Sequence, residues 1–123
     1  MSLKGLHLEL MRSLSQPRFD LDDEKVCQQQ IFDWLVAQFP ERQVDRERRF
    51  GLGADIPDFY IEGVAIEVKM NRARPTEIIK QIGRYAEHPQ ITAVIVATNR
   101  ALRLPGKMAG KPIYGVSLGR AWL

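Results

Sequence analysis

Alternating side chains between residues 58 and 69 constrain the fold of this 123-residue chain more than any other feature. If Glu62 and Gly63 form a two-residue turn, the segments on either side pair as a β-hairpin with Asp58 opposite Glu67. Successive side chains in a strand point to opposite faces. One face is then apolar and carries Phe59, Ile61, Val64, Ile66 and Val68. The other face carries Asp58, Tyr60, Ala65, Glu67 and Lys69, and we expect it to open to a cleft or to solvent.

Two carboxylates, Asp58 and Glu67, meet across this hairpin with their Cβ atoms about 5 Å apart. Their repulsion favours a cation between them, and Mg²⁺ is typically held by one or two carboxylates together with waters and substrate phosphate. Lys69 lies on the same face, where its ammonium would orient an attacking water or neutralise charge on a phosphate. A simpler alternative stays open, in which this is a solvated strand face and Lys69 offsets two acids.

Apolar periodicity predicts the other elements of the chain. We expect helices at residues 3–14, 22–39 and 76–88, and strands outside the hairpin at residues 43–50, 91–98 and 111–118. The run at 91–98 is almost continuously apolar and β-branched, which is typical of a central strand covered on both faces. This order of elements predicts an α/β fold in which helices flank both faces of a mixed sheet.

Composition limits the class of protein. The chain has 18 Lys and Arg against 15 Asp and Glu, for a net charge of +3, a weak excess that does not by itself indicate nucleic acid. Its single cysteine, Cys27, excludes an intramolecular disulfide and falls in an apolar helical pattern, so we expect a buried thiol. No apolar run approaches the roughly 18 residues of a membrane span. We therefore expect no membrane partner and a cytoplasmic location.

The spacing of the charged residues resembles a nuclease signature. Pro57-Asp58, eight intervening residues and Glu67-Val68-Lys69 are similar to the motif of the PD-(D/E)xK nuclease superfamily, and the small phage VRR-NUC-type and Holliday-junction-resolvase-like nucleases are the nearest groups. The resemblance covers about residues 20–118. It implies a restriction-endonuclease-like fold over residues 20–123, preceded by an N-terminal helical extension at residues 1–19. It also implies Mg²⁺- or Mn²⁺-dependent cleavage of DNA in a bacterial or phage-infected cell.

The same resemblance suggests further site residues. The Val68 carbonyl and a helix carboxylate, here Glu24, are expected to join Asp58 and Glu67 as metal ligands, although Glu24 is equally explained as an acid at a helix start. Gln81 and Tyr85 match a QxxxY motif, and positions i and i+4 share a helix face. Tyr85 is equally explained as a core residue.

Basic residues follow the motif closely. Those expected to contact DNA phosphates are Arg72, Arg74, Lys80 and Arg84. A second group (Arg42, Arg46, Arg48 and Arg49) either extends this track or forms a solvated face. One chain has room for one active site, so cutting both strands of a duplex would need a homodimer. Two alternatives stay open: a nucleic-acid-binding module that does not cut, and an interaction domain whose leucine-rich N-terminus binds a partner.

Overall fold

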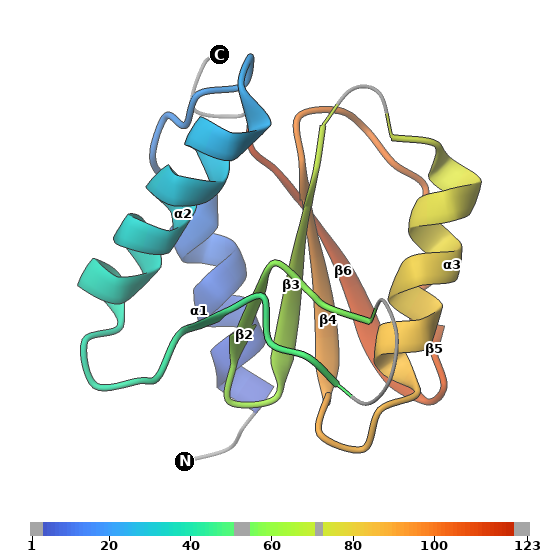
Figure 1. Ribbon diagram of the computed structural model, residues 1–123. Coiled ribbons are helices and arrows are strands. Elements are labelled where there is room, and N and C mark those ends of the chain that lie inside the picture. Colours follow the sequence, from blue (N-terminus) through green and yellow to red (C-terminus); the bar gives the residue numbers. More distant parts are fainter. Residues whose placement is uncertain (1–3, 51–54, 71–72, 120–123) are drawn as a thin grey trace.

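The computed structural model describes residues 4–50, 55–70 and 73–119 of the chain. Its elements are α1 (Lys4–Leu14), α2 (Glu24–Gln38), β1 (Asp45–Arg46), β2 (Phe59–Ile61), β3 (Val64–Lys69), α3 (Pro75–Ala86), β4 (Ala93–Thr98), β5 (Lys107–Met108) and β6 (Lys111–Ser117). The sheet order is β1-β2-β3-β4-β6-β5, with β3, β4 and β6 parallel and the other pairs antiparallel. Helices α1 and α2 lie on one face and α3 on the other (Figure 1), which confirms the predicted α/β class with a mixed sheet.

The β2–β3 hairpin forms in the predicted register. Phe59 pairs with Ile66, Tyr60 with Ala65 and Ile61 with Val64. The two turn residues, Glu62 and Gly63, have φ angles of 43° and 98°. A two-residue turn of type I′ needs a positive φ at both positions, so this turn matches the right-handed twist of the strands.

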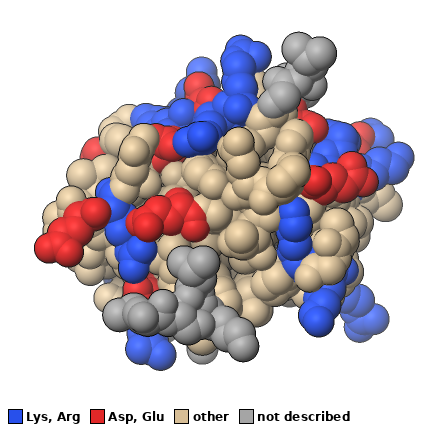
Figure 2. All heavy atoms as spheres, turned by 90° about the horizontal axis from the view of Figure 1, so that it is seen from below, with Lys and Arg blue, Asp and Glu red and all other residues tan. Residues whose placement is uncertain are grey.

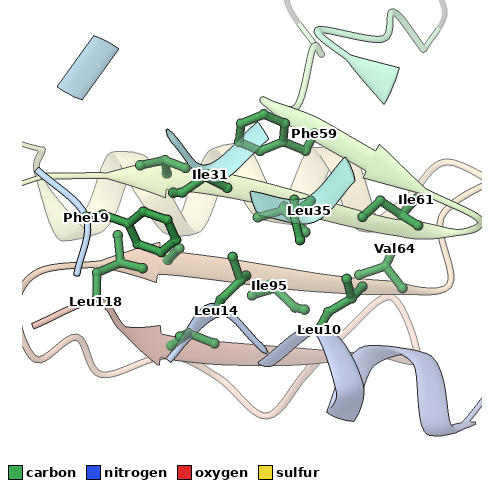
Figure 3. Close-up of a cluster of buried hydrophobic side chains, with 14 of the residues drawn as sticks. Leu10, Leu14, Phe19, Ile31, Leu35, Phe59, Ile61, Val64, Ile95 and Leu118 are labelled. Carbon is green, nitrogen blue, oxygen red and sulfur yellow. The ribbon is translucent and has the colours of Figure 1, made fainter. Parts of the chain in front are cut away.

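The larger core lies between the sheet and the helices α1 and α2. Leu10 and Leu14 of α1 are fully buried there together with Ile31 and Leu35 of α2 and the apolar face of the hairpin (Figure 3). The leucine stripe of the N-terminal helix therefore packs on the core of its own chain. Cys27 is fully buried as predicted, and burial raises its pKa to about 12, so it stays a thiol.

A second core lies beneath α3. It joins Ile82 and Tyr85 of the helix to Ala65 of β3 and to Val94 and Val96 of β4. The expectation that this face of the hairpin opens to a cleft or to solvent is therefore wrong at Ala65 and Glu67 of β3, which are buried, whereas Lys69 lines a surface hollow. The reason is topological: β3 and β4 are parallel neighbours, and the crossover between them brings a helix back over the sheet.

Several boundaries differ from prediction. The strand expected at residues 43–50 is only β1, because Glu47 adopts a positive φ of 50° and ends the extended backbone. The helix expected at 22–39 begins at Glu24, since the Asp23 side chain accepts hydrogen bonds from the backbone of Lys25 and Val26 and so acts as the N-cap. The short β5 was not predicted; a turn at Ala109 and Gly110 pairs it with β6.

No helix within the described ranges is long and apolar enough to cross a membrane.

Candidate active site

The two predicted acids lie together where β2 begins. One residue before β2, Asp58 turns its carboxylate toward β3, where Oδ2 accepts a 2.7 Å hydrogen bond from the Val68 backbone N–H. The Asp58 N–H in turn lies 3.3 Å from Glu67 Oε1 and donates to it. The backbone pairing of β2 with β3 stops at Phe59 and Ile66. Beyond this pair, the Asp58 carboxylate rather than a backbone carbonyl accepts the hydrogen bond from the Val68 N–H.

Glu67 is a buried carboxylate with only 3% of its surface exposed. Its Oε2 lies 3.0 Å from the Lys69 ammonium, and its Oε1 accepts a 3.0 Å hydrogen bond from the Tyr85 hydroxyl. A buried charge is costly unless it is paired and hydrogen-bonded, and these contacts meet that requirement. The structure thus brings Asp58, Glu67, Lys69 and Tyr85 into one cluster.

Both acids resist ionisation. Burial, followed by repulsion from Glu67, raises the pKa of Asp58 from its usual 3.8 to about 7. Burial also raises the pKa of Glu67, although Lys69 and Tyr85 oppose the rise. The metal-free protein therefore favours the neutral forms of these acids, whereas a cation bound between them would favour their charged forms.

Tyr85 is a core residue that also contacts one of the candidate acids. Its ring is fully buried in the core under α3, while its hydroxyl lies 3.0 Å from Glu67 Oε1 and 3.2 Å from the Ile56 carbonyl. Burial and the Glu67 carboxylate raise its pKa, so it acts only as a hydrogen-bond donor to these oxygens. Gln81, the other QxxxY residue, is half-buried and lines a surface hollow together with Lys69.

An ion-pair group that the sequence did not reveal ties the loop before Asp58 to α3. The Asp55 carboxylate contacts Arg84 Nε at 3.0 Å and His88 Nε2 at 3.1 Å. Burial alone would raise the pKa of Asp55, but these two partners lower it. The sequence by itself predicts a turn residue at Asp55 and a helix-end residue at His88, and no local pattern links groups about 30 positions apart.

Glu24 lies near the cluster but not as predicted. Its spacing from Cys27 and Ile31 predicts the inward face of α2, but Glu24 is exposed because it occupies the first turn of the helix, beyond the core. Its Oε1 accepts a 3.3 Å hydrogen bond from the Met70 N–H, and its charge contributes to the raised pKa of Asp58. The Val68 N–H donates a hydrogen bond to Asp58. Since the N–H and C=O of one strand residue point to the same side of the strand, the Val68 carbonyl also faces Asp58.

The donor set fits a hard divalent cation only in part. Within residues 4–50, 55–70 and 73–119, no group of three or more His, Cys, Asp or Glu side chains is arranged to hold a metal ion. Two carboxylates and a carbonyl remain, at Asp58, Glu67 and Val68. This is the sparse set typical of Mg²⁺, which keeps several waters and takes further ligands from a substrate phosphate.

The predicted DNA-contacting cations have different surroundings. Arg72 lies outside the described residues. Arg74 and Lys80 are exposed and line a hollow of about 350 Å³ together with Lys69. Arg84 also lines this hollow, although it is paired with Asp55. In the second group, Arg42 pairs with Glu62 and Arg48 with Asp45. Figure 2 shows Lys and Arg interspersed with Asp and Glu around an uncharged centre, so that view contains no basic patch.

Comparisons of the chain with protein-family models, with curated proteins and with solved structures find no match.

Proposed function

We propose that this protein is a metal-dependent phosphodiester hydrolase that acts on DNA, on a restriction-endonuclease-like fold. The observation that carries the proposal is the pairing of a half-buried carboxylate, Asp58, with a buried one, Glu67, and the Lys69 ammonium 3.0 Å from Glu67. A fold gains nothing from opposing two desolvated acids, and such perturbed groups concentrate at functional sites. The resemblance of the Pro57-Asp58 and Glu67-Val68-Lys69 segments to the nuclease motif points the same way.

Each residue has a distinct task in this proposal. Asp58, Glu67 and the Val68 carbonyl would hold Mg²⁺ or Mn²⁺, which when bound polarises the scissile phosphate and lowers the pKa of a water. Lys69, beside Glu67, would neutralise charge that develops on the phosphate oxygens. Tyr85 fixes the orientation of Glu67 through its hydroxyl.

A cleavage assay tests the proposal. Single-stranded, duplex, flap and four-way DNA would be incubated with the protein and Mg²⁺, Mn²⁺ or a chelator. We expect metal-dependent cleavage that Asp58→Asn and Lys69→Ala abolish. Lys25→Ala is the matched control, because Lys25 is an exposed lysine on α2, on the other side of the sheet.

The Asp58→Asn variant separates a loss of catalysis from a loss of folding. It removes a charge that burial disfavours, so the variant should be at least as stable as the unmodified protein without metal, and urea denaturation would check that it is folded. Absence of metal-dependent cleavage on every substrate would remove the enzyme proposal. If duplex DNA is cut on both strands, sedimentation should also show a homodimer.

A second candidate is a nucleic-acid-binding module that does not cut. It is favoured by one observation: both oxygens of Glu67 already have hydrogen-bond or ion-pair partners within the chain. This candidate predicts salt-sensitive DNA binding that survives Asp58→Asn, with no turnover of any substrate.

A further inference from the structure

Two neighbouring hollows lie along the outer side of α3. Lys80 and Arg84 line both of them, and we call the two hollows together the α3 groove. The first hollow, about 350 Å³, begins at Lys69 beside the candidate acids. The second, about 520 Å³, extends to Met108 on β5, which lies beside α3 in Figure 1.

The floor of the far part of the α3 groove is apolar. Ile79 and Met108 line it, and Gly83 lies between them. A Cβ atom on Gly83 would lie only 2.8 Å from Met108 Cε, so the absence of a side chain there lets Met108 lie against the helix. The result is an apolar strip at the surface, open to a planar ligand group.

Positive charge borders this strip. Lys80 is exposed and has no ion-pair partner among the residues the structure describes. Arg84 is half-exposed and bonds Asp55 through Nε. Two acids, Glu77 and Glu87, also line the groove, and Glu77 lies 4.0 Å from Arg74. The affinity for an anionic ligand should therefore be modest and should depend on Lys80.

We propose that the α3 groove binds a short single-stranded segment of DNA next to the scissile phosphate. The proposal rests on the proposed function and specifies its substrate. Cations along one side and apolar side chains along the floor suit a strand whose phosphates and unpaired bases are both exposed. In a duplex the bases face each other, and the apolar floor would have no partner.

The length of the groove sets the size of the segment. From Glu77 to Glu87 the helix rises about 15 Å, at about 1.5 Å per residue. That length corresponds to about four stacked nucleotides at about 3.4 Å each. A DNA end with about four unpaired nucleotides should therefore bind better than a blunt end.

Fluorescence anisotropy with labelled DNA in a chelating buffer tests this directly. Because the chelator removes divalent metal ions, the protein cannot cut the DNA, and the result is independent of the proposed catalysis. For a duplex with a short single-stranded overhang, Lys80→Ala should weaken binding roughly threefold or more and reduce the salt slope by about 0.7. Met108→Ser should weaken binding without changing that slope, and Lys25→Ala should leave binding unchanged. Thermal melting would check that each variant is folded.

Three outcomes would overturn the proposal: equal losses for Lys80→Ala and Lys25→Ala, full binding by Met108→Ser, or equal affinity for blunt and overhanging duplexes. Cleavage without groove-dependent binding would refute the groove alone, whereas groove-dependent binding without cleavage would refute only the hydrolase.

Discussion

Replacing Asp58 with Asn should stabilise the metal-free protein at alkaline pH. The raised pKa means that the fold favours the neutral carboxyl of Asp58 over the carboxylate. The stability that this preference contributes is fully present below the unfolded pKa and is lost as pH rises through the folded value. An asparagine keeps an oxygen that can accept the Val68 hydrogen bond and never ionises.

The magnitude follows from the pKa values. A change from 3.8 to about 7 corresponds to about 4 kcal/mol when Asp58 is fully ionised in both states. Between about pH 4.5 and about pH 8.5, the gain in stability from Asp58→Asn should grow by about 3 kcal/mol as an upper value. Acids outside the cluster titrate in both proteins, so the difference between the two isolates the Asp58–Glu67 pair.

Urea denaturation in a chelating buffer, followed by tryptophan fluorescence, measures this difference. Asp22→Asn serves as the control because Asp22 is an exposed acid outside the cluster. Parallel stability curves for Asp58→Asn and the unmodified protein across this pH range would refute the reasoning that partial burial and repulsion from Glu67 disfavour the Asp58 carboxylate.

Two other substitutions test the surroundings of the site. Tyr85→Phe removes the hydroxyl that donates to Glu67, so the free energy of unfolding in urea should fall by about 1–3 kcal/mol and DNA cleavage should slow. An unchanged free energy of unfolding together with an unchanged cleavage rate would contradict this contact. Gly63→Ala should cost about 1–3 kcal/mol, since Gly63 has a positive φ and an added Cβ would lie 2.7 Å from the Thr92 hydroxyl. Gly110→Ala has the same kind of backbone strain but no such neighbour, so it should cost less, and the opposite order would contradict the hairpin geometry.

The sequence predicted the local geometry of the site well. Period-two alternation and a Glu-Gly turn are short-range features, and they placed Asp58 beside Glu67 in the register that the structure has. The apolar runs also predicted the α/β class correctly. A pattern of this kind specifies which side chains share a face of the sheet.

The sequence did not predict what covers each face. Ala65 was the one apolar residue on the otherwise polar face of the hairpin, and it lies in the core under α3. The contacts of Asp55 with Arg84 and His88 depend on how α3 packs, and packing between distant segments leaves no periodic signal. Glu47 ends β1 because its φ angle is positive, and a glutamate side chain does not predict a positive φ.

Manganese binding tests the central claim most directly. Electron paramagnetic resonance of free Mn²⁺, titrated with the protein near neutral pH, counts the ions that become bound. One ion should bind per chain, and Asp58→Asn and Glu67→Gln should each greatly weaken it while Asp22→Asn binds normally. Binding that is absent, or that is unaffected by loss of either carboxylate, would contradict the account.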